Sequence, residues 1–513
     1  MQNFRITKIL IFAFTATLVF STANAAEKNI VLFITDDQSP TLGCYGDSIA
    51  ISPHVDALAK DGTMFRNAFA TTASCSASRS VVLSGLHNHA NGQYGHAHHF
   101  HKFSTFPNVV SLSLPQVLAD SGYRTARIGK YHVAPEEVYH FQNVIKSNDR
   151  KPTLMANACA EFIKENSDEP FFLYFATSDP HRSGGVEKSS TLELKPNLFG
   201  NPPQGSIGQT NDADSAEATF DPATVPIPAF LSDTPETREE LAMYYQSCAR
   251  VDRGLGRLVN ILKEAGVYEK TLIVVTSDHG MAFSGGKTTV FEAGLKVPFV
   301  VRDPYQKNRG VENSALISHV DITPSLIDFA GQLDPQTNGP KNWVDPDKYW
   351  RQEQRYMNEN RGPKKELKSW HGKSWLGILG DTDPEHQDSI FASHTFHEIQ
   401  MYYPMRVYRD TKYKLIWNIA YKLDYPFASD LWIASSWQAQ FKQGLDAPYG
   451  NKTVRQYLQR PQFELYDIQS DPDEAYNLAE KEQFAELLEV YKGKLKDRQK
   501  SLNDPWIMKW DYE

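Results

Sequence analysis

The chain has 513 residues, of which 41% are hydrophobic and 12% aromatic, and its formal net charge is −9. This length and composition are typical of a globular protein with a sizeable core, built as two domains or as one large domain with an appendage. The acidic balance argues against a nucleic-acid-binding protein, but it is compatible with a local cationic pocket for an anionic ligand.

The N-terminus is typical of an export signal. Arg5 and Lys8 precede an apolar run at 9–20, and the following Ala-x-Ala sequence favours cleavage after Ala25. The run is shorter than the about 20 apolar residues that span a bilayer, so an uncleaved anchor is the less favoured alternative. We expect an exported protein, periplasmic or secreted, without stable membrane insertion. The four cysteines and single glycosylation sequon favour a bacterial over a lysosomal protein.

Four short apolar runs are each followed by a polar cluster. The runs cover 29–35, 123–128, 171–176 and 271–276, and amphipathic segments lie between them at 53–61, 113–120 and 235–265. This alternation predicts buried strands and crossover helices of an α/β sheet. In an open α/β sheet the ligand lies beyond the carboxyl ends of the strands, so one pocket is expected to gather the polar clusters.

The last third of the chain has a different pattern of predicted elements. Two irregular stretches, 183–234 and 333–373, interrupt the alternation, and the second is expected to close the first domain. Strand-like runs follow at 389–393, 402–409, 413–418 and 464–467, with an amphipathic helix at 481–502. We predict a signal peptide over 1–25, a catalytic domain over 26–385, and a C-terminal subdomain with an antiparallel sheet over 386–513 that contributes to the substrate pocket.

Adjacent carboxylates at a strand end favour a divalent cation. Asp36 and Asp37 follow the first run, and Asp278 and His279 follow the fourth. Helix N-capping is the alternative for a single Asp, but two such clusters indicate metal binding. The dominance of oxygen ligands favours Ca²⁺ over zinc, although the imidazole weakens that preference.

Cys75 is the most informative residue of the chain. It lies in Ser74-Cys75-Ser76-Ala77-Ser78-Arg79, and an apolar turn follows. The residues after Cys75 are predicted to start a helix, where backbone N–H groups favour an anion. A thiol in that field would be acidic and reactive, which makes a thiol nucleophile the alternative chemistry. No carboxylate–histidine relay beside Cys75 supports that alternative.

The motif around Cys75 resembles the signature of the type I sulfatases, with Ala77 where that family most often has Pro. In that family the cysteine is oxidised to formylglycine (3-oxoalanine) by a separate formylglycine-generating or sulfatase-maturating enzyme. The resemblance runs from about Lys28 to the C-terminus. It implies an alkaline-phosphatase-like α/β fold, in which helices cover both faces of a large sheet, with the smaller C-terminal sheet beside it.

The resemblance also implies the site residues. Ca²⁺ would be bound by Asp36, Asp37, formylglycine-75, Asp278 and His279. The sulfate would be surrounded by Arg79, Lys130, His132, His181 and Lys287. Lys130 and His132 alternate on what the sequence predicts to be an extended segment, so both can face one way. Lys130 and Lys287 are candidate sulfate clamps, His132 a candidate base, and His181 a candidate acid for the leaving atom.

Within the family the chain is most similar to the heparan N-sulfatases (sulfamidases). The matching stretches are 129–133, 179–182 and 397–406, which make Asp179, Arg182, Glu398 and Arg406 candidate substrate contacts. His279 and Lys287 stand where sulfamidases have Asn and Arg, which leaves the specificity open. A group of histidines follows the signature and either lines the sugar subsite or forms a solvated loop: His87, His89, His96, His98, His99 and His101.

We therefore expect a sulfatase that acts on a sulfated saccharide. N-sulfated glucosamine is one substrate class, and O-sulfate of an algal polysaccharide such as ulvan is the alternative. A phosphatase or phosphodiesterase of the same fold is more remote, because such enzymes use Ser or Thr with two zinc ions. A non-catalytic glycan binder is least favoured, because every catalytic position is filled.

Overall fold

The computed structural model describes residues 28–98, 102–165, 169–182, 199, 218–350 and 367–511. The predicted signal peptide and two of the histidines, His99 and His101, lie outside these ranges. Within the described ranges, no helix is both long and apolar enough to cross a membrane. All four cysteines have free thiols.

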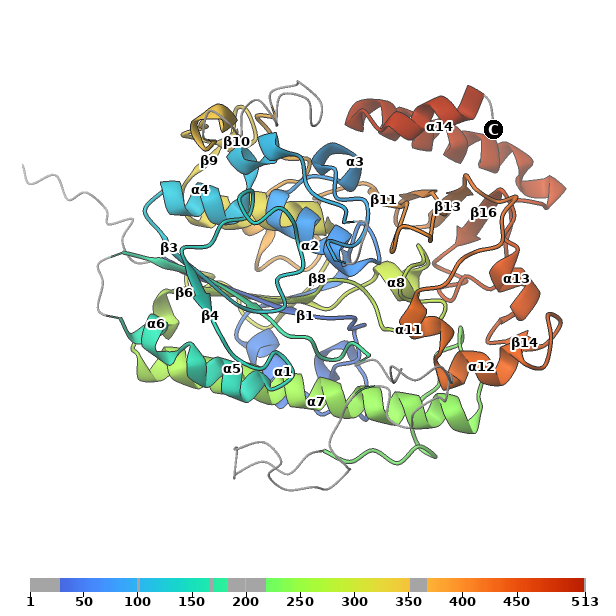
Figure 1. Cartoon of the computed structure of the whole chain (residues 1–513), viewed down its shortest axis with the longest axis horizontal. Helices are drawn as coiled ribbons and strands as arrows, with labels where there is room; N and C mark the ends of the chain where they lie inside the picture. The colour runs from blue at the N-terminus through green and yellow to red at the C-terminus, as the bar shows by residue number, and fades with distance from the viewer. Residues whose placement is uncertain are drawn as a thin grey trace, which may run out of the picture.

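An eight-stranded, mostly parallel sheet forms the centre of the larger part of the molecule (Figure 1). Its order is β4 (Asn143–Ile145), β3 (Arg124–Gly129), β5 (Phe171–Ala176), β1 (Asn29–Thr35), β6 (Thr271–Ser277), β7 (Phe299–Arg302), β2 (Thr63–Phe69) and β8 (Val311–Ser318). Strand β7 runs antiparallel to both of its neighbours. The four strands predicted from sequence are β1, β3, β5 and β6, and all four are confirmed.

Helices cover both faces of this sheet. One face carries α1 (Pro53–Lys60), α5 (Pro152–Ala158), α6 (Ala160–Lys164) and α7 (Pro235–Glu264), and the other carries α2 (Cys75–Ser84), α4 (Leu114–Asp120) and α9 (Ile322–Phe329) (Figure 1). Because successive side chains of a strand point to opposite faces, β1 serves both cores. Leu32 packs in the core with residues of α4 and α9, whereas Phe33 packs with residues of α5 and α7.

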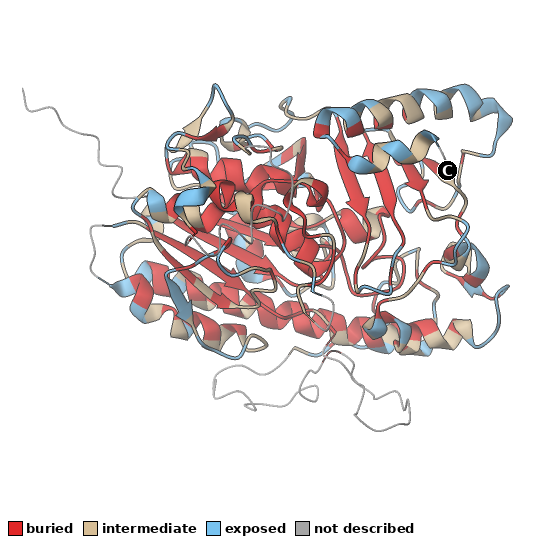
Figure 2. Ribbon diagram, turned by 45° about the horizontal axis from the view of Figure 1, so that its top comes forward, coloured by how far each residue is buried: buried red, intermediate tan, exposed pale blue. Residues whose placement is uncertain are grey.

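The C-terminal part contains the predicted antiparallel sheet. It consists of β11 (Ile390–His394), β12 (Met405–Arg409), β13 (Tyr413–Asn418) and β16 (Phe463–Asp467), in that order. Helix α14 (Ala485–Leu502) covers one face through Tyr491 and Leu495, and Figure 2 shows much of its outer side exposed. The other face packs on the larger part of the molecule. The domain boundary at 385/386 stays a prediction.

Shorter elements complete the structure. The helices are α3 (Asn88–Asn91), α8 (Glu292–Leu295), α11 (Ser429–Trp432), α12 (Ser435–Phe441) and α13 (Val454–Leu458). Two small hairpin-like pairs are β9 (Leu333–Asp334) with β10 (Gly339–Pro340), and β14 (Pro448–Tyr449) with β15 (Lys452–Thr453). Helix α11 contacts the loop that follows β6, because its Asp430 accepts a hydrogen bond from Lys287.

Candidate active site at the carboxyl edge of the sheet

Two predicted carboxylate clusters meet where β1 and β6 end. The strands are paired in parallel with Thr35 beside Ser277, so the residues that follow them are neighbours. The backbone N–H of Asp37 donates to Oδ1 of Asp278 over 3.0 Å. Asp36, Asp37, Asp278 and His279 are all fully buried. No helix starts directly after Asp37, so N-capping does not explain this pair.

Cys75 lies beside these carboxylates as the first residue of α2. Its Sγ is 3.6 Å from Oδ1 of Asp37 and 3.4 Å from Nε2 of His279, and the side chain is fully buried. Burial alone would raise the pKa of the thiol, but Lys130 and Lys287 outweigh it and lower the pKa. The resemblance implies that residue 75 and His279 share one metal site, and the structure brings the two side chains together.

Arg79 holds the carboxylates in place from one turn further along α2. Its Nε donates to Asp278 over 3.1 Å, and its Nη2 donates to Asp36 over 2.9 Å. Its Nη1 donates to the hydroxyl of Tyr174 over 3.1 Å. All the charged groups in these ion pairs are fully buried, so the guanidinium positions the two acids from behind rather than facing the pocket.

The donor set fits a divalent cation. Ligand atoms of Asp37, Cys75, Asp278 and His279 all lie within 4.8 Å of one another, and Asp36 belongs to an adjoining group. Nδ1 of His279 donates to the Gly280 carbonyl over 2.9 Å, which directs Nε2 toward Asp37 and Cys75. Burial and the neighbouring Asp36 carboxylate raise the pKa of Asp278 to about 6. This crowding of buried acids is the arrangement that a bound cation stabilises.

Two lysines provide positive charge beside Cys75, and His181 lies next to one of them. Lys130 donates to Asp36, and Lys287 donates to Asp37 over 3.0 Å and to Nε2 of His181 over 2.8 Å. The side chains of His181 and Lys130 are 20% and 15% exposed, whereas the carboxylates behind them are inaccessible. An anionic group therefore reaches Cys75 from the side of these bases.

Asp430 of α11 is a member of this cluster that the sequence analysis missed. Its Oδ2 accepts a hydrogen bond from Lys287 over 2.8 Å and lies 3.7 Å from Nε2 of His181. Burial would raise the pKa of Asp430, but Lys287 and His181 lower it to a strongly acidic value. No motif surrounds Asp430 in the sequence, and only tertiary packing brings it to the site.

His132 faces the site, but not from an extended segment as predicted. Strand β3 ends at Gly129, and His132 has a φ of 55°, in the left-handed region that non-glycine residues rarely adopt. Asp37, at 62°, and Thr288, at 66° directly after Lys287, share this conformation. A β-branched residue there is strained, and such strain is typical of functional sites held by their surroundings.

The histidines after the signature separate into two groups. His96 and His98 lie at the site, where His98 contacts His132 and His96 packs its ring 3.7 Å from that of His397. His87 and His89 are buried away from it, and both rings pack against that of His371. Neither of the latter two is solvated, because both pack against the C-terminal sheet through Phe391.

Two predicted substrate contacts are instead committed to internal ion pairs. Asp179 is fully buried and accepts from Arg150 over 2.9 Å and from Arg250 over 2.8 Å. Arg182 donates to Glu240 over 2.7 Å, and its guanidinium packs on the ring of Phe283. Both residues follow β5, yet their side chains turn into the protein and brace the loop that carries His181.

The other two predicted contacts, both in the C-terminal part, also differ. Arg406 of β12 is fully buried, pairs with Asp504 over 2.6 Å and packs on Trp506, so the structure does not bring it to the pocket. Glu398 is half-buried and accepts from Ser429 over 3.2 Å, next to Asp430. Of the four predicted contacts, Glu398 alone lies on the accessible side.

These features together define a hydrolase of anionic esters, with a cysteine at a helix N-terminus between a cation-binding acid cluster and two lysines. The chain belongs to the sulfatase family, whose model, described as Sulfatase, matches residues 28–332. It is therefore a sulfuric ester or sulfamate hydrolase, as its sequence predicts.

Comparison with curated proteins and solved structures agrees with this assignment. The chain is 33% identical to human (Homo sapiens) N-sulphoglucosamine sulphohydrolase, over 96% of this chain and 93% of that protein. It is 27% identical to an ulvan-active sulfatase of Formosa agariphila, over 91% of this chain and 79% of that protein. A putative sulfatase from Bacteroides thetaiotaomicron has the same fold, with a TM-score of 0.62 at 16% identity over 94% of each chain.

A phosphonate monoester hydrolase of Agrobacterium radiobacter is also similar in structure. Its TM-score is 0.61 at 18% identity, over 93% of this chain and 96% of that one. The likeness confirms the predicted fold class, a large mixed sheet flanked by helices with a smaller antiparallel sheet, which sulfatases share with hydrolases of other anionic esters.

Proposed function

We propose that this enzyme removes sulfate groups from a sulfated saccharide by means of a formylglycine made from Cys75. The observation that carries the proposal is the position of Cys75, buried at the start of α2 between the acid cluster and the two lysines. A thiol needs no bound cation to act as a nucleophile. A hydroxyl of a hydrated aldehyde, in contrast, becomes more acidic when a divalent cation is bound beside it, and the acid cluster could hold such a cation.

Formation of the aldehyde requires a partner enzyme. The Cβ–Sγ bond of Cys75 is replaced by a carbonyl, sulfur leaves as sulfide, and two electrons pass to an acceptor such as molecular oxygen. A formylglycine-generating or sulfatase-maturating enzyme would supply that acceptor. The alternative, hydrolysis by the intact thiol, predicts an unmodified Cys75.

The two lysines and His181 are suited to bind and cleave the sulfate group. Lys130 and Lys287 would hold the sulfuryl oxygens while a hydroxyl on Cβ of residue 75 attacks sulfur. Ca²⁺, held by Asp36, Asp37, residue 75, Asp278 and His279, would supply positive charge to the sulfuryl oxygens and lower the pKa of that hydroxyl. The bond from sulfur to the leaving oxygen or nitrogen breaks as His181 gives that atom a proton.

Proton movement by the histidines completes the cycle. Burial and Lys287 lower the pKa of His181. An anionic sulfate beside the ring would raise that pKa, so that His181 becomes protonated when substrate binds. Burial and Lys130 lower the pKa of His132 well below its usual range, so it is neutral and able to accept a proton. His132 would deprotonate the second hydroxyl of residue 75, so that the carbonyl reforms and sulfate leaves.

N-sulfated glucosamine is the substrate class that the comparisons favour. The human relative named N-sulphoglucosamine sulphohydrolase matches nearly the full length of both proteins, with higher identity than the ulvan-active sulfatase. O-sulfated algal saccharides are the second class. The predicted signal peptide, although outside the described residues, supports action outside the cytoplasm, in the periplasm or after secretion.

Two measurements test these proposals separately. Mass spectrometry of the Cys75 peptide from active enzyme should find the aldehyde, and full activity with an intact thiol would contradict the mechanism. A panel of N-sulfated and O-sulfated oligosaccharides should show release of N-sulfate, and exclusive O-desulfation would favour the algal alternative. A requirement for zinc rather than calcium would favour the phosphatase-like alternative.

A further inference from the structure

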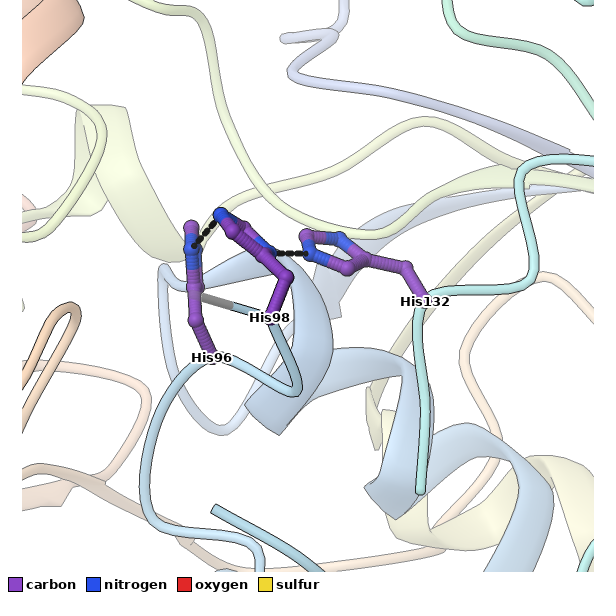
Figure 3. A group of neighbouring side chains, drawn as sticks. All are labelled: His96, His98 and His132. Atoms are coloured by element: carbon purple, nitrogen blue, oxygen red, sulfur yellow. Dashed lines mark hydrogen bonds between the residues drawn. The ribbon is translucent and has the colours of Figure 1, made fainter. Parts of the chain in front are cut away.

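A second group of metal ligands lies beside the carboxylate cluster and contains only imidazoles. Ligand nitrogens of His96, His98 and His132 all lie within 4.8 Å of one another (Figure 3). Nδ1 of His96 is 3.1 Å from Nε2 of His98, and Nδ1 of His98 contacts Nε2 of His132. The three rings come from two loops, one after α3 and one after β3.

The backbone holds these rings before any ligand arrives. The N–H of His96 donates to the carbonyl of His397 over 2.8 Å, and the N–H of Ala97 donates to Ser76 of α2 over 3.0 Å. Gly95 allows this approach, because a Cβ there would lie 2.9 Å from the His397 carbonyl oxygen. His132 is fixed from the other side by its left-handed backbone. The cluster is thus attached to the first turn of the catalytic helix.

The donor chemistry distinguishes this group from the carboxylate site. Neutral imidazoles select zinc, copper or nickel, whereas calcium requires oxygen ligands. Burial lowers the pKa of His96 and of His132, which keeps both rings in the unprotonated form that binds metals. Nε2 of His96 and Nδ1 of His132 are buried and have no hydrogen-bond partner among the described residues. These two nitrogens do not contact His98, whereas Nδ1 of His96 and Nε2 of His132 do and are the atoms that would bind the ion.

We propose that His96, His98 and His132 form a site for a transition-metal ion of the zinc type, and that occupancy of this site inhibits the enzyme. Three imidazoles leave a fourth position for water, as in other three-histidine zinc sites. A metal bound to Nε2 of His132 removes the lone pair that would accept a proton. The inhibitory part rests on the proposed function, whereas the metal site itself does not.

Zn²⁺ binding in saturating Ca²⁺ tests the site. Isothermal titration of the full chain should find one Zn²⁺ that binds at least about 10-fold more weakly to His98→Gln and to His96→Gln. His140→Gln makes the same change at an exposed histidine outside the cluster and should leave the affinity unaltered. Asp278→Asn, which removes a carboxylate ligand, should keep the Zn²⁺ site. Thermal melting of each variant verifies its fold, and Co²⁺ absorption reports nitrogen ligation.

The outcomes separate the two parts of the proposal. Equal Zn²⁺ affinity in wild type and His98→Gln, or loss of binding in Asp278→Asn alone, would overturn the site. Zn²⁺ should inhibit wild type and His140→Gln equally, and the inhibition constant should rise at least about 10-fold in His98→Gln, relative to that variant's own rate. Binding without inhibition would leave the metal site standing and contradict the role proposed for His132.

Discussion

Two regions of this molecule contain buried charged side chains, and they differ in how the acids are arranged relative to one another and to the bases. At the carboxyl edge of the large sheet, acids crowd together: burial and Asp36 raise the pKa of Asp278 to about 6. In the C-terminal part Asp504 is paired with Arg406, which lowers the pKa of Asp504 to about 2 although burial alone would raise it. Buried carboxylates that crowd together are typical of a cation-binding site, whereas a buried acid paired with a base is typical of a contact that stabilises the fold.

The largest expected effect is at the crowded edge. Cys75→Ala removes the proposed nucleophile and should lower kcat/KM by at least about 10³-fold, with little change in thermal stability. Cys159→Ala, which removes another buried thiol, is the matched control and should retain activity. Initial rates on a sulfated saccharide give the measurement, and more than a tenth of wild-type activity in Cys75→Ala would reject the assignment.

The matched pair in the C-terminal part should respond in stability instead. Asp504→Asn leaves the fully buried Arg406 without its counter-charge and should lower the free energy of unfolding by about 3–5 kcal/mol. Because the folded pKa of Asp504 is depressed, its contribution is present above the usual pKa and is lost as pH falls toward about 2. Urea denaturation at neutral pH measures the change.

Kinetics of the same variant decide between the two interpretations of Arg406. The paired geometry predicts that kcat/KM of the folded fraction changes by less than about 3-fold. A large rise in KM with unchanged stability would instead support the substrate contact that the sequence predicts for Arg406.

Asp430→Asn tests the junction between the two regions. Burial lowers the pKa of Lys287, but Asp37 and Asp430 outweigh it and raise the pKa well above its usual value. Loss of the Asp430 charge should therefore lower that pKa and move the alkaline limb of kcat/KM to lower pH, with about a 10-fold loss of rate at neutral pH. The exposed Asp424→Asn is the control. An unshifted limb would show that Asp430 has a merely structural role.

The smallest effect on activity is expected at Glu398, on the accessible side of the site. Glu398 is half-buried and bonded to Ser429, so Glu398→Gln keeps its shape and should alter KM for a saccharide by less than about 3-fold. Michaelis–Menten kinetics on N-sulfated and O-sulfated substrates measure the change. A fall in kcat/KM for only one of the two substrate classes would show that Glu398 contributes to substrate specificity.

Three of the four strands that the sequence predicts, β1, β5 and β6, are buried along their whole length. Strand β1 is buried along its whole length because both faces are covered, and its sequence shows this directly. Strand β2 was missed because the polar Arg66 and Asn67 interrupt its apolar run, and β8 because Glu312 and Asn313 follow its first residue. Strand β7 is fully buried but only four residues long, so its apolar run is too short to stand out in the sequence.

The site was predictable where residues follow strand ends or belong to the motif around Cys75. Asp36, Asp37, Asp278 and His279 could be placed together because parallel strands end at one edge. Asp430 comes from the C-terminal part, and no local pattern marks it. Arg406 was assigned to the pocket from its motif, but a motif does not say which face of a strand its side chain occupies.

The complete burial of Cys75 has a consequence for the order of events in biosynthesis. A separate enzyme cannot reach a side chain with no accessible surface, so the oxidation proposed for Cys75 would have to precede the closing of α2 onto the sheet. The proposed maturation would therefore compete in time with folding. Host cells that delay collapse of the nascent chain should yield a larger share of active molecules, whereas rapid folding should trap them as inert thiols.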